Sequence, residues 1–302
     1  MVNEKISLII PTIGRLNCLN RFLKSLYRQS VLPKEVIVVD SGGEDISGSL
    51  ENNAHINLKY ITAEYPSLTE QKNIGLANID KEAALVAFFD DDIVLERDSL
   101  KRMLDFWDGA GPDVGGASFN NRSDFFKKAN LLERLFCSNS IRSGELLKSG
   151  FNSKISSIEK TKVVDWLLGG LTVWRRNVID EFKFDEWFTG NAYCEDIDYS
   201  HRVAKKYKLM VVKEAAVSHL SCPIDFGKEY YYAKKQAENR VYLVRKHKRF
   251  SLLLCYWSCA GLFLKNVLVG VLGLKRRCFL RSMGILSGIM TTLFNSTNSE
   301  KR

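Results

Sequence analysis

Hydrophobic residues fall into two alternating patterns along the N-terminal part of the chain. Short runs rich in β-branched and aromatic residues predict strands at residues 6–10, 35–39, 58–61 and 84–89. Apolar residues at helical spacing predict helices at residues 17–30 and 69–78. This alternation is typical of an α/β fold in which helices flank a Rossmann-like, mostly parallel central sheet.

Polar residues follow several of these strands at the point where each strand ends. Thr12 follows the first strand, Asp40 follows the second, and three aspartates, Asp90, Asp91 and Asp92, follow the fourth. Ligands of parallel sheets bind at the carboxyl ends of the strands. We therefore expect one crevice to gather these side chains.

The middle of the chain changes in character twice. Residues 120–160 are polar and lack regular periodicity, and we expect them to form a mobile excursion over the crevice. Core-like sequence resumes at residues 163–174. Further on, a helix is expected to run to about Tyr207, and residues 209–212 predict a last strand.

The C-terminal region is aromatic and basic at first and then strongly apolar. We divide the chain accordingly into an α/β domain at residues 1–229 and a helical region at residues 230–302. Residues 252–274 are long enough to span a bilayer, but Lys265 near their centre costs roughly 2.5–3.5 kcal/mol on insertion scales.

Basic residues interleaved with Trp, Phe and Leu in this region fit helices that lie in the interface of an anionic membrane. We favour a peripheral or monotopic attachment to a membrane surface. The alternatives are a true membrane span and a helical cap that packs on the α/β domain or on the partner in a homodimer.

Charge and cysteine content narrow the classes of partner and compartment. The formal net charge is +9, but no RNA-binding signature or zinc-finger spacing accompanies the basic residues, so we expect no nucleic-acid partner. The seven cysteines are scattered, which argues against paired disulfides and a zinc site and favours a reducing compartment. The N-terminus shows no signal segment, and we expect the chain in the cytoplasm.

The three consecutive aspartates, Asp90, Asp91 and Asp92, carry the clearest chemical signal. Carboxylates this close repel each other unless a cation lies among them. Oxygen ligands of this kind suit Mg²⁺ or Mn²⁺, which proteins often share with substrate phosphates. The alternative is a solvated acidic loop that caps the next helix.

A second acidic cluster, Glu195, Asp196 and Asp198, lies far away in the sequence. Two separate clusters suit a division of labour in which one holds a metal and the other accepts a proton. The alternative is that these acids complement the dipole of a helix N-terminus. His219 follows a strand-like run, where it is either a further metal ligand or a structural histidine.

Two glycines, Gly169 and Gly170, interrupt an otherwise apolar segment, which indicates close approach of a ligand or of another strand. Trp166 and Trp174 flank them. We assign Gly169, Gly170 and Trp166 to the binding of an acceptor molecule, and packing in the core is the alternative for the tryptophans.

Taken in order, these segments resemble the family-2 glycosyltransferases of bacteria, which have the GT-A nucleotide-sugar-binding fold. The resemblance runs from about residue 6 to residue 220 and rests on motifs at residues 6–12, 35–42, 72–75, 88–92, 169–170 and 194–198. Each motif is weak alone, and their common order is the specific signal.

On the donor side, the resemblance implies that Pro11, Thr12 and Asp40 contact the nucleotide and that Lys72 lies beside its diphosphate. The family often has a second Asp or Asn after the strand-two aspartate, whereas this chain has Ser41. That departure bears on the base contact and hence on which nucleotide is used.

At the reacting centre, the resemblance implies that Asp92, with Asp90 and His219, binds Mg²⁺ or Mn²⁺. Asp91 should contact the donor sugar or its ribose. Asp196 should be the general base, and Glu195 should orient it or the acceptor.

The expected function is that of an inverting glycosyltransferase in bacterial surface polysaccharide synthesis. It would move a sugar from a nucleotide-diphosphate sugar to a hydroxyl of a glycan or lipid-linked acceptor at the cytoplasmic face of the inner membrane. The alternatives are a nucleotidyltransferase and a non-catalytic, membrane-bound scaffold of the same fold.

Overall fold

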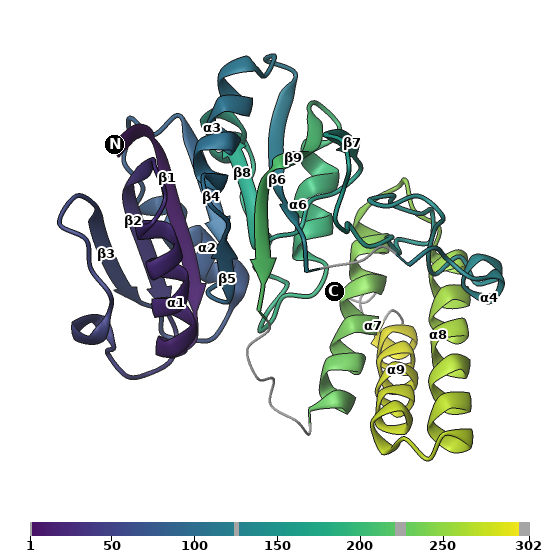
Figure 1. Cartoon of the computed structure of the whole chain (residues 1–302). Helices are drawn as coiled ribbons and strands as arrows, with labels where there is room; N and C mark the ends of the chain where they lie inside the picture. The colour runs from purple at the N-terminus through teal and green to yellow at the C-terminus, as the bar shows by residue number, and fades with distance from the viewer. Residues whose placement is uncertain (1, 124–126, 221–227, 296–302) are drawn as a thin grey trace. The chain divides into compact units, whose positions relative to one another are not determined.

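The computed structural model describes residues 2–123, 127–220 and 228–295 (Figure 1). The chain forms two compact units. The first comprises Met1–Phe126 and Ile155–Cys222, and the second comprises Lys127–Lys154 and Pro223–Arg302. The boundary after residue 229 stays a prediction.

The first unit is built on one mixed sheet, with strands in the order β3-β2-β1-β4-β8-β6-β9-β5 and β7 paired to β9. The strands are β1 (Val2–Thr12), β2 (Leu32–Asp40), β3 (Asn57–Thr62), β4 (Leu85–Phe89), β5 (Ile93–Leu95), β6 (Val114–Asn121), β7 (Lys162–Val164), β8 (Leu171–Arg175) and β9 (Lys208–His219). The first four strands in this order pair in parallel, as predicted. Strand β8 then runs antiparallel to both of its neighbours.

Helices cover both faces of this sheet, which is why β4 is apolar throughout and β2 is continuously apolar from Val36 to Val39 instead of alternating. The helices of the first unit are α1 (Leu16–Tyr27), the 3₁₀ helix η1 (Ser47–Ser49), α2 (Leu68–Ala77), α3 (Ser99–Gly109), α5 (Arg176–Glu181) and α6 (Glu195–Val203). Helices α1 and α3 share one core with the sheet, in which Phe89 contacts Phe22 and Phe119. On the other face, Gly75 of α2 lies against Ile9.

The predicted α/β class is therefore confirmed, with two differences in detail. The last strand, β9, is longer than the expected residues 209–212 because its far end pairs with β5. The stretch at residues 120–160 is not one irregular excursion. Strand β6 continues to Asn121, and Lys127–Lys154 belongs to the second unit.

The second unit contains the short α4 (Leu131–Leu135) and three long helices, α7 (Glu229–Lys246), α8 (Leu252–Leu272) and α9 (Arg276–Asn295). Arg240 of α7 is buried, donates to the carbonyl of Gly150 and lies over the ring of Phe151, 4.6 Å from its centroid. These contacts attach Lys127–Lys154 to the C-terminal helices. By length and composition, α8 could cross a membrane.

The cysteines depart from expectation at one position. Five described cysteines are free, namely Cys137, Cys194, Cys255, Cys259 and Cys278. Cys18, however, is disulfide-bonded, which contradicts the expectation that disulfides do not form.

Candidate active site

The register of the sheet brings the predicted polar residues to one edge. Thr12 pairs with Asp40 at the ends of β1 and β2. Strand β4 ends opposite the start of β8, which places the aspartate triplet beside Gly170. At the same edge, His219 pairs with Ile93, the residue that follows the triplet.

The three aspartates of the triplet have different environments. Asp91 is fully buried and accepts hydrogen bonds from the Thr12 hydroxyl at 2.5 Å and from the Arg15 guanidinium. Burial raises the pKa of Asp91 to about 6, although both of these partners favour its charged form. Both oxygens of Asp91 are thus used within the protein, and its expected contact with the donor stays a prediction.

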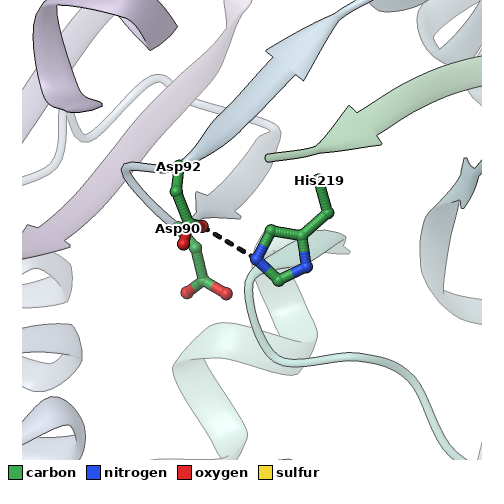
Figure 2. A group of neighbouring side chains, drawn as sticks. All are labelled: Asp90, Asp92 and His219. Atoms are coloured by element: carbon green, nitrogen blue, oxygen red, sulfur yellow. Dashed lines mark ion pairs between the residues drawn. The ribbon is translucent and has the colours of Figure 1, made fainter. Parts of the chain in front are cut away.

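Asp90 and Asp92 instead turn toward His219 (Figure 2). The Nε2 atom of His219 lies 2.9 Å from an Asp92 oxygen, and one ligand atom from each of the three residues lies within 4.8 Å of the others. Burial raises the pKa of Asp90, and the neighbouring Asp92 raises it further. Two carboxylates and an imidazole fit a Mg²⁺ or Mn²⁺ ion in their number and chemistry, and a cation would relieve the repulsion.

Gly170 makes room for Asp90. A Cβ atom at position 170 would lie only 2.0 Å from the Asp90 carboxyl carbon. The Gly170 carbonyl also accepts a hydrogen bond from the Asp90 backbone N–H at 3.0 Å. Gly170 therefore leaves space for the Asp90 carboxyl group and fixes the Asp90 backbone. Its expected contact with an acceptor stays a prediction.

Glu195 of the second acidic cluster is part of a buried ion pair. Lys72 of α2 is 1% exposed, and its Nζ atom lies 2.6 Å from Glu195 Oε1 and 3.2 Å from the carbonyl of Gly169. A Cβ atom at Gly169 would lie 2.5 Å from the same Glu195 oxygen. The second oxygen of Glu195 is buried and has no hydrogen-bond partner among the described residues.

Burial determines the titration of Glu195. It raises the pKa to about 7, and the negative charge of Asp196 adds to this, while Lys72 acts in the opposite direction. Asp196 is the next residue in the first turn of α6, is partly exposed and accepts a hydrogen bond from the N–H of Ile197. Of this pair, Asp196 is the carboxylate that solvent can reach.

Asp40 organises the loops at the other end of the edge. One of its oxygens accepts hydrogen bonds from the backbone N–H groups of Gly14 and Gly42, each at 2.8 Å. The other accepts from the Tyr60 hydroxyl at 2.8 Å. Asp40 is 1% exposed, and its expected contact with a nucleotide base stays a prediction.

The remaining expected binding residues, Pro11 and Trp166, are both buried. Pro11 pairs with Val39 inside the sheet. Trp166 is 3% exposed, which leaves little of its ring for stacking on a sugar. Their assignments to donor and acceptor binding also stay predictions.

Three residues that hold the site together were not selected from the sequence. Arg15 pairs with Asp91, and Tyr60 donates to Asp40. Gln71 donates to the carbonyls of Thr12 and Val39, each at 2.7 Å, and so joins the ends of β1 and β2. Of these three, only Arg15 had a local signal, because it follows the first strand-end motif directly.

Residues 7–173 match the sequence profile of Glycosyl transferase family 2. The chain is 23% identical over 275 residues to the minor teichoic acid biosynthesis protein GgaA of Bacillus subtilis, covering 83% of this chain and 53% of that protein. It is 29% identical over 106 residues to the glycosyltransferase GlyA of Streptococcus pneumoniae, covering 34% and 15%. The chain spans about half the length of GgaA and a smaller share of GlyA.

Two solved structures show the same fold. The mannosyltransferase PcManGT from Pyrobaculum calidifontis, in complex with GDP-Man and Mn²⁺, superposes with a TM-score of 0.60 at 16% identity, covering 96% of this chain and 87% of that one. S. aureus TarS 1-349 in complex with UDP-GlcNAc gives 0.51 at 15% identity, covering 95% and 92%. The expected GT-A fold is thereby confirmed.

We expect Gly170→Ala to weaken Mn²⁺ binding about 10–100-fold, because the new methyl group displaces Asp90 from the acidic cluster. Isothermal titration with MnCl₂ measures this directly. Gly48→Ala is the matched control, because a Cβ atom there meets nothing within 4 Å. Equal Mn²⁺ affinity in the two variants would show that Asp90 is not a ligand.

Glu195 is expected to make stability depend on pH. Its folded-state pKa of about 7 lies above the ordinary value of 4.5, so the folded state binds the proton more tightly. The free energy of unfolding should therefore fall as pH rises from about 4.5 to about 7. Urea unfolding in EDTA at several pH values measures the slope. Glu195→Gln should reduce the slope and leave the part that Asp91 contributes, whereas the exposed Glu159→Gln should not change it. Parallel curves for all three proteins would contradict the assignment.

Proposed function

Because the chain belongs to Glycosyl transferase family 2, we propose that it transfers a sugar from a nucleotide-diphosphate sugar to a hydroxyl of a glycan or lipid-linked acceptor. The observation that carries the proposal is the meeting of two acidic groups at one sheet edge. Asp90, Asp92 and His219 form the first group, and the Glu195–Asp196 pair forms the second.

The similar structures support the donor class. PcManGT was solved with GDP-Man and TarS 1-349 with UDP-GlcNAc, and both ligands are sugars on a nucleoside diphosphate. In this chain, the loops held by Asp40 lie at the carboxyl ends of β1 and β2, where parallel sheets bind nucleotides. We assign the nucleotide to this part of the edge, beside Pro11 and Thr12.

Asp90, Asp92 and His219 would hold the Mg²⁺ or Mn²⁺ ion. When bound, the cation neutralises negative charge on the diphosphate leaving group. Lys72 adds a positive charge near Asp90 and partly opposes the rise in the pKa of that carboxyl that burial causes. The chain's own contribution on this side is therefore to hold the phosphates and to stabilise the charge that they gain.

Asp196 is the proposed general base. An acceptor hydroxyl is a poor nucleophile, so its proton passes to the Asp196 carboxylate as its oxygen attacks the anomeric carbon. The bond between that carbon and the diphosphate oxygen breaks on the opposite side, and a single displacement inverts the anomeric centre. The Lys72–Glu195 ion pair holds the first turn of α6, which carries Asp196.

The acceptor class follows from the relatives. GgaA is named for minor teichoic acid biosynthesis, and we extend to this chain a role in the synthesis of a bacterial surface polymer. We propose that the acceptor is linked to a lipid and that transfer takes place at the cytoplasmic face of the inner membrane. The apolar α8 supports association with a membrane, which we propose to be peripheral or monotopic.

Asp196→Asn should lower the rate of transfer about 10²–10⁴-fold, because the amide cannot accept the proton. Donor affinity should stay near the wild-type value, since Asp196 is placed on the acceptor side. Single-turnover release of nucleoside diphosphate measures the rate, and calorimetry measures donor binding. Asp180→Asn, on the surface of α5, is the control. Transfer by Asp196→Asn at the wild-type rate would reject this base.

A panel of nucleotide sugars that includes UDP-GlcNAc and GDP-mannose should contain a donor that raises Tm only when Mn²⁺ or Mg²⁺ is present. At 100 times its Kd, a ligand stabilises the fold by about 2.7 kcal/mol. Asp92→Ala should abolish this shift, whereas the exposed Asp105→Ala on α3 should retain it. A shift in Asp92→Ala equal to that of wild type would exclude Asp92 as the metal ligand.

A further inference from the structure

The outer surface of α8 is apolar along its length. Large hydrophobic side chains recur at helical spacing and are between 45% and 79% exposed at Leu253, Trp257, Leu264, Leu268 and Val271. A surface helix of a soluble protein normally carries charged or polar residues at such positions. Only 22% of the most apolar window of α8 is buried within the structure, so α8 is not an enclosed core helix.

Two other helices of the second unit that contact α8 also carry exposed hydrophobic residues. On α9, a second exposed stripe is formed by Phe279, Met283, Leu286, Met290 and Leu293. On α4, Leu131, Leu132 and Leu135 are each at least 60% exposed. Trp257 ties α4 to α8, because its ring nitrogen donates to the carbonyl of Leu135 at 2.9 Å. We call the exposed hydrophobic residues of α4, α8 and α9 the apolar face.

Basic residues predominate around the apolar face, where Glu133 of α4 is paired with Lys265 and Arg277 of α9 is paired with Glu229. Residues 239–295 contain no Asp or Glu, and they include ten basic residues, namely Arg240, Arg245, Lys246, Lys248, Arg249, Lys265, Lys275, Arg276, Arg277 and Arg281. Exposed Lys275 lies in the turn between α8 and α9, and exposed Arg276 begins α9. Leu272 and Leu274, close by in the chain, are 80% and 92% exposed. Hydrophobic and cationic groups thus occur together at one end of the helices.

The packing of the three long helices limits how deeply they can enter a bilayer. Gly284 and Gly288 of α9 lie directly against the backbone of α7. Helix α7 carries charged residues, among them Lys234, Lys235 and Glu238. If α8 crossed the bilayer with this packing intact, α7 would be carried into the hydrocarbon region. In the middle of α8, Lys265 also pairs with Glu133 at 2.9 Å.

We propose that the apolar face is a docking surface for an anionic lipid bilayer, on which α8 and α9 lie in the plane of the membrane. The hydrophobic stripes enter the boundary between headgroups and acyl chains, and Lys275 and Arg276 contact lipid phosphates. This refines the membrane location given above and does not depend on the transfer reaction.

Charge favours a membrane over a second copy of the chain as the partner. In a symmetric dimer, the same patch meets itself. Two apolar faces in contact would then bring together two sets of basic residues with no acidic residue of 239–295 to offset them. A surface of anionic lipids offers hydrophobic contact and the opposite charge at once.

Sedimentation of the full chain with extruded vesicles of phosphatidylglycerol and phosphatidylethanolamine tests the proposal. Val271→Gln should weaken partitioning about tenfold, which corresponds to the loss of one buried aliphatic side chain. Lys275→Gln should weaken it about fivefold and only on anionic vesicles. The matched controls are Val163→Gln, which is as exposed but lies on β7, and Lys160→Gln. Both should bind as wild type.

Three results would overturn the proposal. The first is absence of wild-type binding to anionic vesicles. The second is binding by Val271→Gln and Lys275→Gln that equals binding by their controls. The third is a wild-type dimer, seen by light scattering, that Val271→Gln dissociates while vesicle binding is unchanged, which would make a second copy the partner. Donor hydrolysis in detergent-free solution, measured in parallel, separates failure of this proposal from failure of the proposed function.

Limited trypsin digestion of vesicle-bound protein tests the orientation. With α8 in the plane of the membrane, the turn with Lys275 and the first residue of α9, Arg276, stay on the outer side, and mass spectrometry should detect cleavage there without detergent. If α8 crossed the bilayer, the same turn would lie inside the vesicle, and cleavage would require detergent. That second result would replace in-plane docking with a membrane span.

Discussion

Repulsion among carboxylates is the constraint on which the rest of the site depends. The fold places Asp90, Asp91 and Asp92 at one edge of the sheet, and it brings Glu195 and Asp196 of α6 beside Gly169, the neighbour of the Gly170 that contacts Asp90. Two positively charged side chains neutralise part of this negative charge. Arg15 is bonded to Asp91, and Lys72 is bonded to Glu195. Asp90 and Asp92 face each other and His219, and a divalent cation between them is the natural complement.

The contacts of Asp91 with Arg15 and of Glu195 with Lys72 give the acids of the site different roles. Asp91, once bonded to Thr12 and Arg15, joins the end of β4 to the loop after β1. Glu195, bonded to Lys72, joins α6 to α2 and leaves its neighbour Asp196 as the carboxylate open to solvent. Acids that look equivalent in the sequence thus have structural or chemical roles according to which of them is buried and paired.

The second unit obeys a different constraint. Its helices α7 and α9 pack closely through glycines, and this packing keeps the charged α7 beside the apolar helices. An apolar surface with basic residues around it therefore remains exposed to solvent. Under the proposed function, attachment to a lipid surface would hold the molecule near a lipid-linked acceptor.

The sequence by itself determined the α/β class, the strands that end in acids, and the two acidic clusters. Each of these features follows from local periodicity or from residues that are neighbours in the sequence. Only the tertiary structure decided which acids pair with which cations. Lys72 and Glu195 are 123 positions apart, and Asp91 and Arg15 are 76 apart. The roles of Tyr60 and Gln71 could not be predicted for the same reason. A hydrogen bond to Asp40 or to the carbonyl of Thr12 produces no pattern in the sequence around the donor. Long-range contacts of this kind depend on the register of the sheet, which brings distant strand ends within bonding distance.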